Sequence, residues 1–159
     1  MKRELIAYLR AEAVVCGAFN FFVNGMLAGL IHHRAERVSV APASAAIDLF
    51  LTCFTIFLLA APFAKASLGR TKAAALLPCS RPFERRLSRA FRRPALFGAL
   101  CGALAAAAFI ALVVPALALA GFETVAFLAY VMLKSAFSAL LGAAAMALCL
   151  YAGMLKENG

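Results

Sequence analysis

The sequence predicts an all-α integral membrane protein, built as a single bundle of four transmembrane helices. Hydrophobic residues make up 65% of its 159 residues, whereas soluble domains contain roughly 45–50%. Four apolar stretches are each long enough to cross a bilayer, which takes about 20 helical residues. None of them alternates between apolar and polar residues as a barrel strand would. A chain of this length corresponds to one domain.

Short polar segments separate the four predicted spans. The first apolar stretch is longer than the core of a signal peptide, about 7–15 residues, so we expect a retained helix. A polar, basic loop separates the second span from the third, and a tight turn at residues 120–123 separates the third from the fourth. The spans are expected at about residues 11–31, 43–63, 94–119 and 124–151, and the loop at 64–93.

The distribution of Lys and Arg predicts how the chain is oriented. Thirteen of these residues lie in the N-terminal segment, the loop 64–93 and the C-terminal segment, which share one side of a four-span protein. The opposite side carries only Arg34 and Arg37. Because cytoplasmic segments are enriched in basic residues, we expect a multi-pass protein of the cell membrane, such as a bacterial inner membrane, with both termini cytoplasmic.

The loop contains a predicted amphipathic helix over about 82–93. Phe83, Leu87 and Phe91 recur at helical spacing. A basic amphipathic segment that leads into a span is typical of a helix at the membrane surface, with its cations on anionic headgroups. A docking surface for an acidic partner is the alternative, and no nucleic acid is needed to explain the net charge of +9. The arginines of the polar face are Arg81, Arg85, Arg86, Arg89, Arg92 and Arg93.

Three of the spans carry a stripe of polar side chains, and charged groups inside a span are candidates for function. Lys134 lies eleven residues beyond Glu123, so about 16 Å below the outer end. The stripes fall at similar depths, and we expect them to face one another in the outer half of the bundle. Asp48 is the expected counter-charge of Lys134, with Glu123 second. The candidate binding residues are Lys134, Asp48, Asn20, Asn24, Thr52, Ser138 and Tyr130.

Motifs of catalysis and metal binding are not found in the sequence. His32 and His33 point about 100° apart on a helix, have no third ligand nearby and are expected at the outer surface, remote from Lys134. The five cysteines form no C-x-x-C pair. Neither a nucleophile elbow nor a phosphate-binding loop is present. We therefore expect no enzyme activity, metal or cofactor.

Two hypotheses about function remain. The first is that the protein binds or moves a small polar or anionic solute through a polar site in the outer half of the bundle. The second is a non-enzymatic accessory subunit that docks a partner membrane protein through its basic cytoplasmic helix. The Gly25-x-x-x-Gly29 and Gly98-x-x-x-Gly102 motifs predict close helix packing, either inside the chain or in a homo-oligomer.

Overall fold

A computed structural model describes residues 2–71 and 77–156, and this part of the chain is almost entirely helical. Four helices are long and apolar enough to cross a membrane, which fits the predicted multi-pass bundle. The helices are α1 (Lys2–Ile31), α2 (Pro42–Thr71), α3 (Pro82–Phe91), α4 (Pro94–Leu119) and α5 (Phe127–Met154). The strands are β1 (Arg37–Ser39), β2 (Leu77–Pro78), β3 (Thr124–Ala126) and β4 (Leu155–Lys156).

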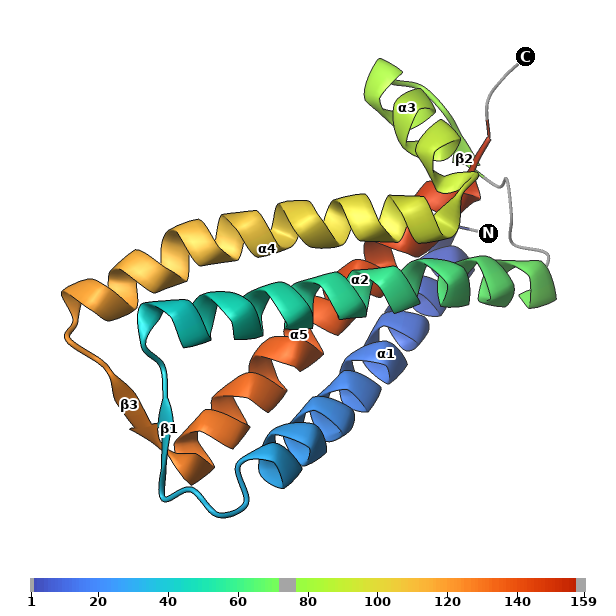
Figure 1. The fold of residues 1–159 in the computed structure, drawn as a ribbon. Helices are drawn as coiled ribbons and strands as arrows, with labels where there is room; N and C mark the ends of the chain where they lie inside the picture. Colours follow the sequence, from blue (N-terminus) through green and yellow to red (C-terminus); the bar gives the residue numbers. More distant parts are fainter. Residues whose placement is uncertain (1, 72–76, 157–159) are drawn as a thin grey trace.

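The long helices form two interlocked hairpins, α1–β1–α2 and α4–β3–α5 (Figure 1). The first helix of each hairpin packs on the second helix of the other, so α1 lies against α5 and α4 against α2. Helices α2 and α5 also contact each other in the middle. The two halves therefore exchange packing partners, although their sequences show no clear residue match.

Two short strand pairs tie the hairpins together at opposite ends. β1 and β3 are antiparallel, with Val38 opposite Val125. Just beyond the paired residues of β1 and β3, the backbone N–H of Val40 donates a hydrogen bond to the carbonyl of Glu123 over 2.8 Å. β2 and β4 form a parallel pair at the other end, beside α3. We call these the strand end, defined by β1 and β3, and the α3 end, defined by α3, β2 and β4.

Two of the long helices extend beyond the predicted spans. α1 begins at Lys2 instead of near residue 11, and α2 continues to Thr71 instead of ending near residue 63. Pro62 is therefore inside a helix. The extension of α2 is explained by packing, because Ala64 and Leu68, one turn apart, are both buried in the core. Lys72 of the predicted loop lies outside the described residues.

The core of the bundle is concentrated toward the α3 end. There α2 and α5 bring together buried small and medium-sized side chains such as Ala61, Ala145 and Leu150. Gly98 and Gly102 place α4 against the backbone of α2, and a Cβ at Gly102 would lie 2.9 Å from the Cα of Phe54. The predicted close approach at these glycines is confirmed, and it occurs within the chain.

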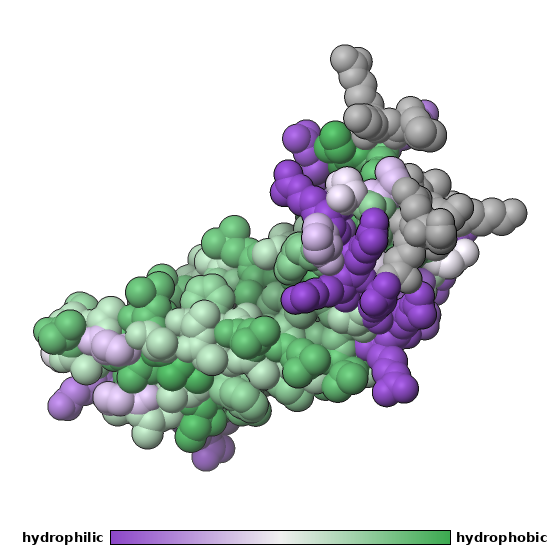
Figure 2. Space-filling model, turned by 90° about the horizontal axis from the view of Figure 1, so that it is seen from above, coloured by the Kyte–Doolittle hydropathy of each residue, from purple (hydrophilic) through white to green (hydrophobic). Residues whose placement is uncertain are grey.

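The expected amphipathic helix is present as α3, which projects across the end of the bundle (Figure 1). Glu84 closes its first turn by accepting hydrogen bonds from the backbone N–H groups of Ser80 and Arg81 at 2.7 and 3.0 Å. These bonds stabilise the carboxylate and lower the pKa of Glu84 to about 2. Most of the visible hydrophilic residues gather around this end of the molecule, whereas the rest of the visible surface is mainly hydrophobic, with a few hydrophilic residues at the opposite end (Figure 2).

Candidate functional site: a cavity at the strand end

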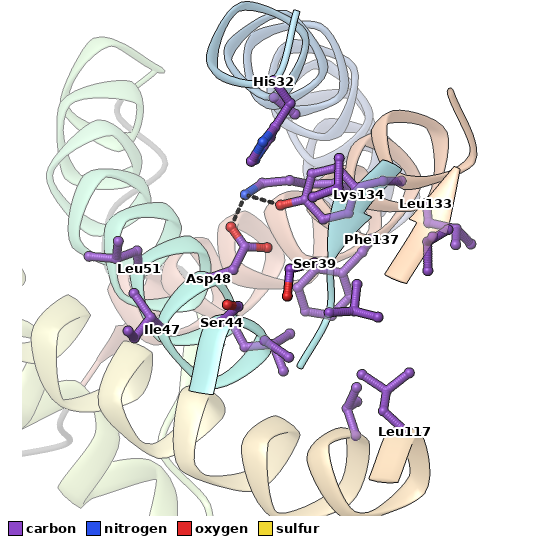
Figure 3. A pocket seen from close by; sticks show the side chains of 18 of the residues that line it. His32, Ser39, Ser44, Ile47, Asp48, Leu51, Leu117, Leu133, Lys134 and Phe137 are labelled. Atoms are coloured by element: carbon purple, nitrogen blue, oxygen red, sulfur yellow. Dashed lines mark hydrogen bonds and ion pairs between the residues drawn. The ribbon is translucent and has the colours of Figure 1, made fainter. Parts of the chain in front are cut away.

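A cavity of about 590 Å³ lies at the strand end of the bundle (Figure 3). All four long helices and both strands of the β1–β3 pair contribute side chains to its wall. The reason is visible in Figure 1, where the α1–α5 pair separates from the α2–α4 pair toward the strand end. The volume falls within the range of about 300–1,000 Å³ that is typical of small-molecule sites.

An ion pair between Lys134 of α5 and Asp48 of α2 crosses this cavity. It was predicted from the sequence, and Figure 3 shows the two side chains pointing toward each other. The Lys134 side chain is 14% exposed and that of Asp48 is 35% exposed. The carboxylate is therefore the more accessible member of the pair, and the cavity presents both a cation and an anion.

Two aromatic side chains lie beside the ammonium group of Lys134. The phenol oxygen of Tyr130 is 3.5 Å from Nζ, and the same nitrogen is 5.7 Å from the centre of the Tyr130 ring. The imidazole of His32 meets this ring edge-to-face, with centroids 5.3 Å apart. The ammonium therefore lies at the hydroxyl end of the Tyr130 ring. Tyr130 and His32 thus extend the polar part of the site.

Most of the remaining wall is apolar. Ser39 of β1 and Ser44 of α2 add two hydroxyl groups. The other side chains carry only hydrocarbon, so polar groups make up the smaller part of the wall. The apolar lining includes Ile31, Val38, Ile47, Leu51, Val113, Leu117, Leu133 and Phe137.

The asparagines of α1 do not join this cavity, although the sequence suggested that they would. The Asn20 amide donates to the carbonyl of Cys16 over 2.9 Å, and the Asn24 amide donates to the carbonyl of Asn20 over 3.2 Å. Asn20 also packs on α5 at Gly142, where an added Cβ would lie 2.6 Å from the amide nitrogen. A backbone carbonyl of α1 itself therefore accepts a hydrogen bond from each of these amides.

Thr52 and Ser138 are also separate from the cavity. Both are buried, with 4% and 0% of their surfaces exposed, and neither is among the described residues that line the cavity. The hydroxyl of Ser138 has no hydrogen-bond partner within the described part of the chain. Of the predicted binding residues, the structure thus brings Lys134, Asp48 and Tyr130 together at the cavity.

His32, Ser39 and Ser44 were not predicted as site residues. His32 was expected to be remote from Lys134 because the depth of Lys134 was counted from Glu123. Residues 124–126 form a strand, so α5 begins at Phe127 and Lys134 lies only seven residues, about 10 Å, along the helix. A helical lysine also leans toward the N-terminus of its helix, which brings its ammonium close to His32.

The polar side chains of the site offer hydrogen-bond donors and acceptors. No group of three or more His, Cys, Asp or Glu side chains suited to a metal ion occurs among the described residues. Comparisons of the chain with protein-family models, curated proteins and solved structures found no match. Function must therefore be argued from the cavity and the charges around it.

Proposed function

We propose that the protein binds or moves a small polar or anionic solute through the strand-end cavity. The observation that supports the proposal is the ion pair of Lys134 and Asp48 inside a cavity of about 590 Å³. Charged groups at membrane depth are rare and mark binding sites or solute pathways. A closed structural ion pair would need no space beside it.

The composition of the cavity wall indicates which kind of solute would fit. Because most of the lining side chains are apolar and only a few are polar, a solute with a polar head and a short apolar remainder fits better than a fully hydrated ion. An anionic head would compete with Asp48 for the ammonium of Lys134, and the phenol of Tyr130 would supply a further donor. Medium-chain carboxylates are the simplest molecules of this class.

We also propose that the strand end faces outward and that the α3 end lies in the cytoplasm. The basic residues counted from the sequence support this orientation, since Arg34 and Arg37 are the exceptions at the strand end. Single cysteines at positions 36 and 90, both exposed, in a cysteine-free background would test it. An impermeant thiol reagent added to intact cells should label position 36, and labelling of position 90 instead would reverse the orientation.

Equilibrium binding of radiolabelled octanoate to the purified protein in nonionic detergent tests the proposed function. The wild type should bind octanoate saturably, and Lys134→Met should weaken binding at least about tenfold, because a charge-assisted hydrogen bond contributes roughly 1.5–3 kcal/mol. Lys65→Met is the matched control, since Lys65 is an exposed lysine of α2 that lies outside the cavity. Equal loss in both variants would contradict the assignment of the site.

The accessory-subunit hypothesis remains the second candidate, because the direct contact between Lys134 and Asp48 is also what a purely structural ion pair would form. Under that hypothesis the cavity has no solute. Octanoate and octylammonium should then bind the wild type no better than they bind the Lys134→Met and Asp48→Leu variants. The ion pair would affect only the stability of the bundle.

A further inference from the structure

We propose that the exposed face of α3 is a preformed binding surface for anionic phospholipids in the leaflet at the α3 end. This surface, which we call the α3 arginine face, consists of Arg85, Arg86, Arg89, Arg92 and Arg93, with Phe83 at its margin. All five arginines are exposed, and the side chain of Phe83 is 68% exposed. The proposal does not depend on whether the strand-end cavity binds a solute.

The opposite face of α3 fixes the helix to the end of the bundle. In its first turn, Glu84 accepts a hydrogen bond from the phenol of Tyr151 in α5 over 3.1 Å. In its middle, the hydroxyl of Ser88 donates to the carbonyl of Leu155 over 3.1 Å. In its last turn, Phe91 is buried and meets Phe97 of α4 edge-to-face.

These attachments decide which way the arginines point. Residues 84, 87, 88 and 91 share one face of a helix, and each further residue turns by about 100°. Arg85 and Arg86 consequently lie about 100° and 200° around the helix from Glu84 on the attached face, and Phe83 lies about 100° from Glu84 in the opposite sense. Arg93 follows the helix as the N-cap residue of α4. The helix therefore has an attached face, a basic face and an apolar margin.

The position of this basic face in the chain favours lipid over an acidic protein. Arg93 immediately precedes Pro94, the first residue of the apolar helix α4, so the arginines lie where a membrane-crossing helix would meet the headgroups. Phe83 can enter the boundary of the acyl chains beside them. Because α3 is already held in place, lipid binding would order few additional side chains.

Fluorescence anisotropy of labelled phosphatidylglycerol, added to the purified full-length protein in nonionic detergent, tests the proposal. The wild type should bind this lipid at least about tenfold more tightly than labelled phosphatidylcholine, and substitution of Arg85, Arg86 and Arg93 by Gln should remove most of that preference. The matched control replaces Arg10, Lys65 and Arg70 by Gln. It removes the same charge from exposed sites on α1 and α2 and should retain the preference.

Three results would overturn the proposal. The wild type could bind both lipids equally, the control variant could lose as much affinity as the α3 variant, or millimolar inorganic phosphate could displace the lipid as well as unlabelled phosphatidylglycerol does. Binding of polyglutamate in place of lipid would reassign the face to an acidic protein.

If the α3 variant does not fold, the salt dependence of lipid binding to the wild type decides the question. Its lipid preference should collapse between about 0.01 M and 1 M salt, as the Debye length falls from about 30 Å to 3 Å.

Discussion

The two ends of the bundle are built in different ways. At the α3 end, small side chains on α2 and α5 pack into a core, and hydrogen bonds attach α3 to it. At the strand end, the helix pairs separate, and a cavity with an ion pair occupies the space between them (Figures 1 and 3). The comparison indicates that one end supplies stability, whereas the other leaves room for a ligand.

Glycine substitutions should give the largest difference between the two ends. Gly98→Leu would force a side chain into the backbone of α2 at Phe57 and Leu58, so we expect the free energy of unfolding to fall by about 3 kcal/mol or more. Gly29→Leu is the matched control toward the strand end, because a Cβ at Gly29 would meet nothing within 4 Å. Thermal unfolding in detergent measures both, and similar losses would contradict the difference in packing.

The ion pair should give the next largest effect. Asp48→Leu leaves the less exposed Lys134 without its partner and should cost about 2–3 kcal/mol. Lys134→Met leaves the more exposed carboxylate, which water can reach, and should cost about 1–2 kcal/mol. The double variant should recover most of this loss, because neither charge is then stranded. Additive losses in the double-mutant cycle would show that the two residues do not act as a pair.

These residues also show how far the sequence alone could lead. Lys134 and Asp48 were predictable as partners because a charge inside a span requires one. Asn20 and Asn24 were expected at the same site and do not line the cavity, because spacing places them on one face but does not reveal that carbonyls of α1 already accept their hydrogen bonds. His32 was missed because a three-residue strand shortened α5 at its start.

The four spans could be predicted because lipid imposes their length and composition. The interlocked order of the hairpins could not, since apolar helices of this kind offer many possible partners of equal hydrophobicity. The close approach of α4 to α2 depends on Gly98 and Gly102. A pair of glycines in the sequence predicts close packing, but it does not identify the helix that packs there. The β1–β3 pairing depends mainly on backbone hydrogen bonds, which do not identify the partner strand in the sequence.

Acid should weaken the α3 end selectively. The pKa of Glu84 is lowered from 4.5 to about 2 in the folded protein, mainly by backbone hydrogen bonds from Arg81 and Ser80. Its contribution to stability is therefore complete above pH 4.5 and is lost as the pH falls toward 2. The unfolding temperature of the wild type should decrease over this interval, and that of Glu84→Gln should change less. Parallel curves would show that the attachment of α3 does not depend on this carboxylate.

The smallest effect is expected at Ser138. Its hydroxyl is buried without a partner in the described part of the chain, so Ser138→Ala removes an unsatisfied polar group. The free energy of unfolding should rise or stay within about 0.5 kcal/mol of the wild-type value. Octanoate binding should not change, because Ser138 does not line the cavity. A clear loss of binding would place this residue in the site after all.

Thiol accessibility along α2 tests the contrast between the two ends most directly. In a cysteine-free background, Ala45→Cys places a thiol on the cavity wall, and Ala61→Cys places one in the core, where Ala61 is 0% exposed. In sealed, right-side-out vesicles, an impermeant maleimide should label Ala45→Cys and should leave Ala61→Cys unlabelled. Labelling of Ala45→Cys only after lysis would contradict the orientation. Equal labelling of the two positions, or none at either, would contradict the open cavity at the strand end.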